Sequence, residues 1–460
     1  MSRENRLLET ESIGKLLLKL GLPGVVAQVV NLLYNIVDRI YIGHIPGVGS
    51  AALTGVGLFT PILMLLSAFA MLVGSGGAPR VAIAMGQKNR DAAEEIVGNS
   101  LTALLLFAAA LTAVFYLFCP QLLRGFGASN VTLPYAVDYA RIYILGSVFV
   151  LLVLGMNPFI TAQGFAAVSM LTTLIGAVIN IALDPVFIFA LGLGVRGAAL
   201  ATVLSQAVGA LWILKFLTGK KTMLRLRPQC MPIRWSVLGP CLGLGISTFV
   251  MLSTESLLSI SFNASLAAYG GDLAVGAMTI ITSTTQLIQM PMNGLCQGAQ
   301  PIISYNFGAG LSDRVRKAFR LLLTVTVSYC ALFWAALQLV PGVFAGIFTT
   351  DAELTAYTVW TMRVYMAGIF STGFQLCCQQ SFMALGQAKI SLLMACLRKL
   401  ILLIPLIFLL PNFFSDKVFA VFLAEPVSDI IAAAVTTTMF FTRFGGILER
   451  GAARIGDRRA

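Results

Sequence analysis

The sequence predicts an all-α membrane protein with twelve transmembrane helices in two six-helix lobes, related by an internal pseudo-two-fold repeat. Of its 460 residues, 58% are hydrophobic and only 11% are charged, a composition typical of polytopic membrane proteins. Apolar stretches long enough to cross a bilayer recur along the whole chain, separated by Gly, Pro or charged residues. The two halves of the chain also share landmarks at one constant shift in residue number.

Each span is placed by its apolar length and by the breaks on either side of it. The expected helices cover 15–44, 51–80, 94–119, 134–162, 167–191, 196–217, 237–266, 273–302, 317–345, 354–384, 390–411 and 417–442. An even number of spans puts both termini on the same side. The first span has no small-residue cleavage site, so we expect it to be a retained helix and not a signal peptide.

Basic residues indicate the orientation, because cytoplasmic connections are enriched in Lys and Arg. Most of the 31 Lys and Arg residues fall in the N-terminal segment, in the second, sixth, eighth and tenth connections, and in the C-terminal tail. Lys389, Arg398 and Lys399 are assigned to the tenth connection. Both termini are therefore expected to be cytoplasmic. The net charge of +12 then reflects membrane orientation and does not indicate nucleic-acid binding.

The repeat divides the chain into two lobes. Shifting the second half back by 222 residues aligns Gly76 with Gly298 and Pro79 with Pro301, and Ala162-Gln163-Gly164 with Ala384-Leu385-Gly386. The expected domains are an N-lobe at 1–217, a cytoplasmic inter-lobe linker at 218–236, a C-lobe at 237–442 and a basic cytoplasmic tail at 443–460. Two parallel bundles around a central cleft are a common transporter plan, with the binding site at the repeat interface.

Two acids in the N-lobe break this repeat. Asp38 lies in the first span and aligns with Ile260, and Asp184 lies in the fifth span and aligns with Leu406. A carboxylate inside a membrane span is costly and normally faces protein or water. Since the second half has apolar residues at these positions, the scaffold does not need the acids, and a functional role is favoured over a purely structural hydrogen-bond network.

Counting residues from the outer helix ends, at about 1.5 Å per residue, places several polar side chains at a depth similar to that of Asp38. We expect an oxygen-rich cation site, suited to Na⁺ or protons, formed by Asp38, Asn180, Asp184 and Thr202, with Asn35 and Gln206 nearby. Na⁺ would be held at Asp38 and Asp184. No other metal is expected.

The C-lobe contains different acids. Glu255 lies deep in the seventh span, and Glu425 and Asp429 are one turn apart in the twelfth. These three could bind a cationic substrate or a second coupling ion. Alternatively, Glu425 and Asp429 could accompany a helix kink at Pro426, or pair with Arg363 or Arg398.

Several runs resemble the multidrug and toxic compound extrusion (MATE) family, in particular its MepA-like bacterial branch. They are GLPGVVAQVVNLLYNIVDRIYIGH at 21–44, GSGGAPRVAIAMGQKNR at 74–90, NIALDPVFIFALGLGVRGAALAT at 180–202 and QGAQPIISYNFGAG at 297–310. The resemblance implies a V-shaped exporter that couples drug efflux to inward Na⁺ or H⁺ flow. It carries the family's N-lobe cation site onto Asp38, Asn180, Asp184 and Thr202, the helix-bending proline onto Pro23, and the C-lobe acid onto Glu255.

These features predict a secondary active multidrug exporter that exchanges amphipathic, cationic drugs for Na⁺ or H⁺ by alternating access. Its partners would be small-molecule drugs and the bilayer of a bacterial inner membrane, with no nucleic acid and no cofactor, and the protein would be a monomer. The alternative is a flippase for lipid-linked oligosaccharides or lipids from the same superfamily. A major facilitator transporter is disfavoured because the second connection reads GQKNRDAAEE. An enzyme is disfavoured because the sequence shows no metal or nucleophile motif and only one histidine.

Overall fold

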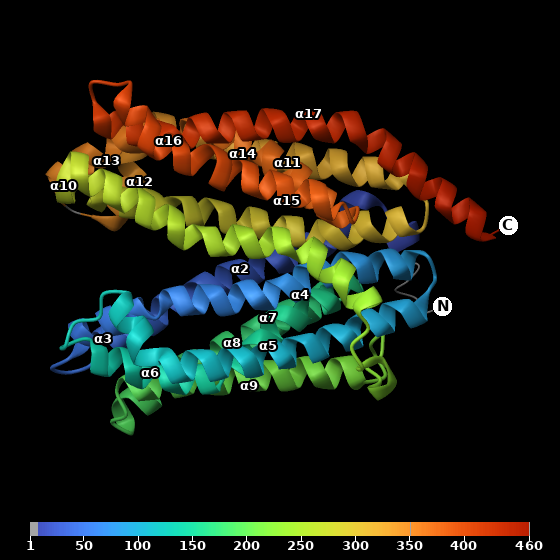
Figure 1. Cartoon of the computed structure of the whole chain (residues 1–460), viewed down its shortest axis with the longest axis horizontal. Coiled ribbons are helices and arrows are strands. Elements are labelled where there is room, and N and C mark those ends of the chain that lie inside the picture. The colour runs from blue at the N-terminus through green and yellow to red at the C-terminus, as the bar shows by residue number, and fades with distance from the viewer. Residues whose placement is uncertain (1–7, 350, 460) are drawn as a thin grey trace.

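The computed structural model describes residues 8–349 and 351–459, so expectations that concern Arg3 and Arg6 lie outside the described part. Figure 1 shows two bundles of long helices side by side, with both termini at the same end of the molecule. We call that end the terminal face and the other end the opposite face. The predicted all-α, two-lobe fold is confirmed, and the common side of the termini agrees with an even number of spans.

The N-lobe follows the predicted spans closely. Its elements are α2 (Ile13–Gly43), α3 (Gly49–Leu58), α4 (Thr60–Gly86), α5 (Arg90–Gly125), α6 (Leu133–Leu145), α7 (Ser147–Ala162), α8 (Ala166–Pro185), the π-helix η1 (Val186–Ala190) and α9 (Val195–Thr218). Helices α6 and α7 together form one span, bent by 56° where they meet. Pro23 lies inside α2, which continues as one helix through it.

The C-lobe begins with α10 (Trp235–Gly308), a 74-residue element that contains two spans. Gly271 interrupts it with φ +63° and ψ −159°, a backbone conformation open essentially only to glycine. The helix runs away from the terminal face up to this point and returns after it (Figure 1). The expected break between the seventh and eighth spans is therefore a single glycine.

The remaining C-lobe elements complete six passes. They are α11 (Ser312–Leu339), α12 (Pro341–Phe348), α13 (Ala352–Tyr365), η3 (Met366–Gly368), α14 (Ile369–Ala384), α15 (Ala388–Cys396), the π-helix η4 (Leu397–Leu403), α16 (Ile404–Leu409), η5 (Leu410–Asn412) and α17 (Lys417–Arg459). The segment assigned to the basic tail, 443–460, is helical as far as the structure describes it, because α17 continues as one helix to Arg459.

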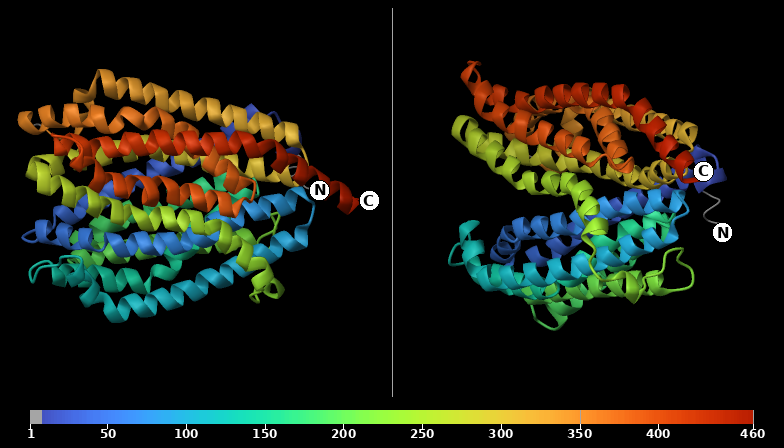
Figure 2. Two further views of the ribbon diagram at one scale, coloured as in Figure 1. Left: turned by 45° about the horizontal axis from the view of Figure 1, so that its top comes forward. Right: turned by 45° about the vertical axis from the view of Figure 1, so that its right-hand side comes forward.

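Glycine-rich contacts join the lobes in the helix halves nearest the terminal face. Gly76 of α4 packs against the backbone of α10 at Cys241 and Gly245, and Gly24 of α2 packs against Gly294. Small residues let membrane helices approach to backbone contact. The Ser75 hydroxyl adds a hydrogen bond of 2.9 Å to Thr248 across the same interface. Toward the opposite face the two bundles diverge (Figure 2).

The connection between the lobes is folded against the N-lobe. The Gln163 side-chain oxygen accepts hydrogen bonds of 2.8–3.0 Å from the Thr222 hydroxyl and from the backbone N–H groups of Met223 and Leu224. Asn99 bonds to the backbone of both Cys230 and Arg234. The linker is therefore a bound part of the N-lobe surface, and the right-hand view of Figure 2 shows it running from one lobe to the other at the terminal face.

Candidate functional site

Three N-lobe helices bring the four predicted cation-site residues together. The Asn180 amide donates to the Asp184 carboxylate at 3.4 Å within α8, and to the Thr202 hydroxyl of α9 at 3.3 Å. The carboxyl group of Asp38, on α2, lies within electrostatic range of that of Asp184. Asn180, Asp184 and Thr202 are buried, and Asp38 is partly buried. The depth count from the sequence thus selected side chains that meet in space.

This N-lobe cluster contains more acceptor oxygens than donors. Among the described residues, Asp38 Oδ1, Asp184 Oδ2 and Asn180 Oδ1 are buried without a hydrogen-bond partner. Buried polar atoms are normally satisfied, and an exception requires an explanation. Carboxylate and amide oxygens are ligands for hard cations, and carboxylates also take protons. These unpaired oxygen atoms therefore fit a site for a cation or a proton.

Local structure fixes the direction of these side chains. Asp184 stands before Pro185 and the π-helix η1, and π-turns within helices often occur at functional sites. Thr202 donates its own hydroxyl proton to the Ala198 carbonyl at 3.0 Å. Its oxygen is then left to accept the bond from Asn180.

Three tyrosines around the cluster were missed by the sequence reasoning. Tyr34, Tyr139 and Tyr143 are all within electrostatic range of Asp38, and the Tyr139 hydroxyl also interacts with Thr202. Tyr139 and Tyr143 stack one turn apart on α6, with ring centroids 5.9 Å apart. The i, i+4 spacing of the α6 tyrosines was visible in the sequence, but nothing there assigned their face to Asp38.

Two of the secondary candidates do not join this cluster. The Asn35 amide donates to the backbone carbonyl of Asn31, at 2.6 Å, on its own helix, and Asn35 is exposed. Gln206 is partly buried and forms no hydrogen bond to the four residues in the described structure. A depth similar to that of Asp38 is not sufficient for a side chain to join the cluster, because the helix must also be rotated so that the side chain points toward it.

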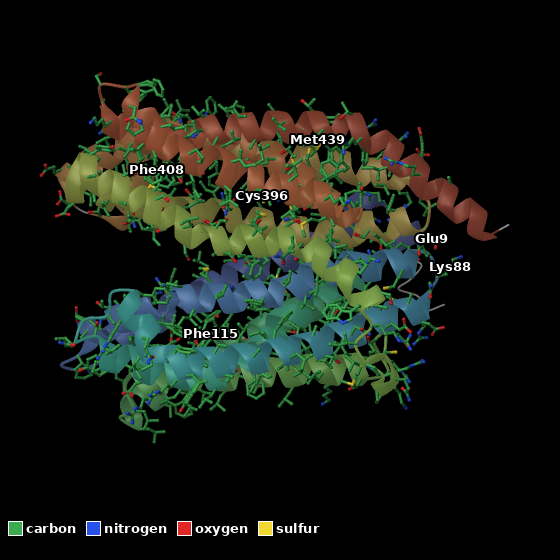
Figure 3. All side chains as sticks on the ribbon, in the orientation of Figure 1. Glu9, Lys88, Phe115, Cys396, Phe408 and Met439 are labelled. Atoms are coloured by element: carbon green, nitrogen blue, oxygen red, sulfur yellow. The ribbon has the colours of Figure 1, made fainter. Side chains whose placement is uncertain are left out.

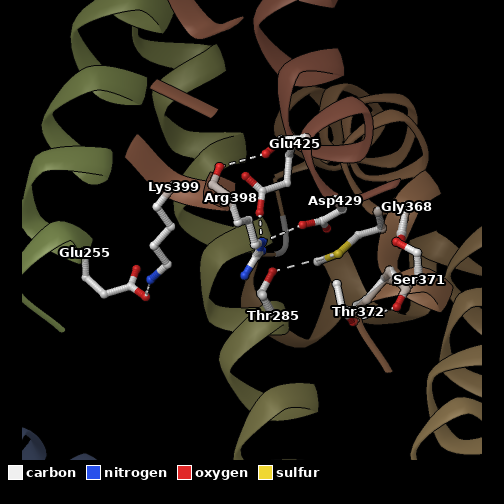
Figure 4. Close-up of polar contacts among 12 residues, drawn as sticks. Glu255, Thr285, Gly368, Ser371, Thr372, Arg398, Lys399, Glu425 and Asp429 are labelled. Atoms are coloured by element: carbon white, nitrogen blue, oxygen red, sulfur yellow. Dashed lines mark hydrogen bonds and ion pairs between the residues drawn. The ribbon is translucent and has the colours of Figure 1, made fainter. Parts of the chain in front are cut away.

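The C-lobe acids form a second cluster, shown in Figure 4. Arg398 donates through Nε to Asp429 at 2.7 Å and through Nη2 to Glu425 at 2.9 Å. Next to it, Lys399 pairs with Glu255 and also donates to the Met251 carbonyl at 3.2 Å. Both basic residues lie on the π-helix η4. The expected pairing of Glu425 and Asp429 with Arg398 is present, and the described residues show no ion pair with Arg363.

The assignment of Arg398 and Lys399 to a cytoplasmic connection is therefore wrong. Both lie inside the span formed by 388–412, and their side chains are only 16% and 6% exposed. They are stable there because three acids neutralise them, whereas an isolated charge would be costly. Lys389 is the second residue of α15, shortly after the connection from α14.

Comparisons with known proteins agree with this architecture. A family model named MatE matches residues 23–186 and 247–409, one stretch in each half of the chain, as the internal repeat predicts. The multidrug export protein MepA of Staphylococcus haemolyticus is 26% identical over 433 residues, covering 94% of this chain and 95% of that protein. MepA of Staphylococcus aureus is 25% identical over 431 residues, covering 93% and 94%.

Solved structures share the fold. A MATE protein crystallised in a bent conformation superposes with a TM-score of 0.92 at 23% identity, covering 98% of this chain and all of the other. A MATE family multidrug resistance transporter in an outward-facing conformation gives a TM-score of 0.89 at 23% identity, covering 98% and 99%. With the family model matching most of both lobes, the chain belongs to the MatE family of transporters.

Proposed function

We propose that this protein is a secondary active multidrug exporter of a bacterial inner membrane, exchanging amphipathic cationic drugs for inward Na⁺ or H⁺. The observation that carries the proposal is the N-lobe cluster, in which two adjacent carboxyl groups and an amide present unpaired buried oxygens. The similarity to MepA proteins, which are named as multidrug exporters, supports the substrate class.

The coupling ion would act on Asp38 and Asp184. With both carboxylates ionised and close together, their repulsion is relieved by a bound cation or proton. A ligand drives a conformational change only when it binds the two states differently. The ion would therefore draw α2 toward α8, and Pro23 of α2 is where the helix would yield. A proline supplies no N–H to the carbonyl one turn earlier, which weakens the helix at that point.

The lobe contacts at the terminal face would separate in the opposite state of the cycle. The lobes join there through glycines that allow backbone contact, and the bundles diverge toward the opposite face (Figure 1). With both termini cytoplasmic, this conformation would be closed to the cytoplasm and would release drug outward. Alternating access would then be a rocking of the two lobes.

The C-lobe cluster favours a cationic substrate over an anionic one. Two basic residues are matched there by three acids, so no surplus positive charge is available for a pyrophosphate. Glu255 has a half-exposed side chain and would receive the substrate cation. A flippase for lipid-linked oligosaccharides, the second candidate, would instead need a site with excess positive charge.

The decisive test uses proteoliposomes loaded with ethidium under a Na⁺ gradient alone and under a pH gradient alone. One of the two gradients should drive efflux, and Asp38→Asn and Asp184→Asn should each abolish it. Asp138→Asn is the matched control, because Asp138 pairs with Arg196 at 3.0 Å in an exposed position of the same lobe. Full efflux by both site variants, or lipid scrambling without efflux, would overturn the proposal.

A further inference from the structure

A cavity of about 680 Å³ opens at the terminal face, and its lining, within the described part of the chain, includes no residue of either cluster introduced above. Five basic residues line it, together with Tyr305 from the end of α10: Lys88, Arg90, Lys220, Arg225 and Arg227. Its walls come from the α4–α5 turn, from the inter-lobe linker and from the C-lobe. Figure 3 labels Lys88 at this end of the molecule. The cavity therefore lies where three separate parts of the chain meet.

The walls of this basic cavity are held in place by buried hydrogen bonds. Gln163 fixes the linker at Thr222, Met223 and Leu224, all of which line the cavity. Glu94 accepts the Arg225 backbone N–H at 3.2 Å. A ligand would meet positively charged groups on a preformed frame, so little ordering of the chain would oppose binding.

Only part of the positive charge is neutralised. The carboxylate of Glu94 pairs with Arg90 at 2.9 Å and with Arg227 at 3.0 Å. In the described part of the chain, Lys88, Lys220 and Arg225 form no ion pair with an acid, and all three are exposed. None of the described residues that line the cavity is an acid, and Glu9 acts electrostatically on the lining residue Tyr305. The cavity keeps an excess of positive charge.

Lys88 occupies this wall at a conformational cost. It has φ +60°, and it is the one non-glycine residue with positive φ in the described structure. The repeat places Gly310 at the same position of the C-lobe, where φ is +78°. Glycine adopts this conformation freely, whereas lysine is strained in it. Arg90 likewise aligns with Ser312. The fold thus accepts neutral residues at both positions, so the positive charges of Lys88 and Arg90 are specific to the N-lobe.

From this geometry we propose that the basic cavity is a binding site for a phosphate group, carried by an anionic phospholipid headgroup or present as free phosphate. Phosphate matches clustered Lys and Arg donors. The site lies beside the contact of Gly86 with the backbone at Tyr305 and Gly308. A phosphate bound there would bridge the N-lobe, the linker and the C-lobe, and would favour the state in which the terminal face is closed.

Native mass spectrometry of the purified full-length protein tests binding. We expect phosphatidylglycerol, but not phosphatidylcholine, to remain bound, with affinity falling roughly fivefold for each cation removed. The test variants are Lys88→Gly, Lys220→Gln and Arg225→Gln, made singly and combined in one triple variant. Lys88→Gly should fold well because the C-lobe has a glycine, Gly310, at the corresponding position. Lys221→Gln is the matched control, since Lys221 is an exposed neighbour outside the cavity lining.

Competition separates the two sources of phosphate. Lipid adducts that persist in excess inorganic phosphate assign the site to a headgroup, whereas displacement of the lipid, with phosphate retained by the wild type only, assigns it to the free ion. Equal lipid and phosphate binding by the wild type and the triple variant would overturn the proposal. The assay needs no transport activity, so its result is independent of the drug-export proposal.

Hydrogen–deuterium exchange in nanodiscs tests the bridging effect. Exchange in segments 83–90 and 305–311 should slow when phosphatidylglycerol or phosphate is added to the wild type and stay unchanged in the triple variant. Binding without any slowing in these segments would contradict the bridging between lobes.

Discussion

The Lys399 ammonium group pairs with the Glu255 carboxylate and joins the π-helix of the eleventh span to the first half of α10. The two partners differ in burial, because the Lys399 side chain is 6% exposed and the Glu255 side chain 54%. Because of this difference, the cost of removing one partner depends on which charge is left unpaired. An orphaned lysine would be buried, whereas an orphaned glutamate could be solvated.

Glu255→Gln should therefore destabilise the protein more than Lys399→Met does. Breaking a buried ion pair from one side costs about 3–5 kcal/mol, and the half-exposed partner reduces this to roughly 2 kcal/mol for Glu255→Gln. The double variant should recover most of the loss. Thermal unfolding of the detergent-solubilised protein measures all three. A larger loss for Lys399→Met than for Glu255→Gln would contradict the assigned burial.

Arg398 holds two carboxylates through two different nitrogens, which a lysine cannot reproduce. Arg398→Lys should lower stability by about 2–4 kcal/mol, because Glu425 or Asp429 loses its buried partner. Adding Asp429→Asn to Arg398→Lys should remove part of the penalty, which a double-mutant cycle measures. Arg196→Lys, at an exposed pair, is the control and should leave the melting temperature nearly unchanged, because solvent screens an exposed pair. Equal losses of stability for Arg398→Lys and Arg196→Lys would contradict the buried pairing of Arg398 with two carboxylates.

Thr202 is the acceptor that links α9 to the Asn180 amide. Thr202→Val should weaken the apparent affinity for the coupling ion by about tenfold, the equivalent of one lost hydrogen bond. Thr202→Ser should retain it. Gln206→Ala serves as the control, because Gln206 lies one turn away but does not bond to the cluster. Ion titration of drug efflux in proteoliposomes gives the affinity, and an unchanged value for Thr202→Val would exclude this link.

Two glycines on the same helix should respond oppositely to alanine. An alanine Cβ at Gly245 would overlap the Leu72 carbonyl across the lobe interface, whereas Gly243 has nothing within 4 Å of that position. Gly245→Ala should cost about 1–3 kcal/mol through overpacking. Gly243→Ala should be neutral or stabilising by up to about 1 kcal/mol, since alanine favours helix. Melting temperatures that shift in the same direction would show that the lobes do not meet as described.

Local patterns in the sequence predicted the spans and their order well. Hydropathy sets which segments enter a bilayer, and this is a property of each segment alone. The constant shift of 222 residues also predicted corresponding turns, and Gly164 and Gly386 both adopt positive φ where α7 and α14 end. The helix α17 extends beyond the expected end of the last span at 442, because the charged residues that follow can be helical without having the hydropathy of a span.

Sequence patterns are sufficient to predict the fold class and the two-fold repeat. They also predict a shared depth for Asp38, Asn180, Asp184 and Thr202, because helical rise converts residue number into depth. Which of the side chains at that depth face one another depends on how the helices pack. Helix rotation and π-turns set this, and they depend on packing between segments distant in the chain. The same reason explains why Arg398 and Lys399 were assigned to a loop: their acidic partners lie on α10 and α17, and no local pattern connects them.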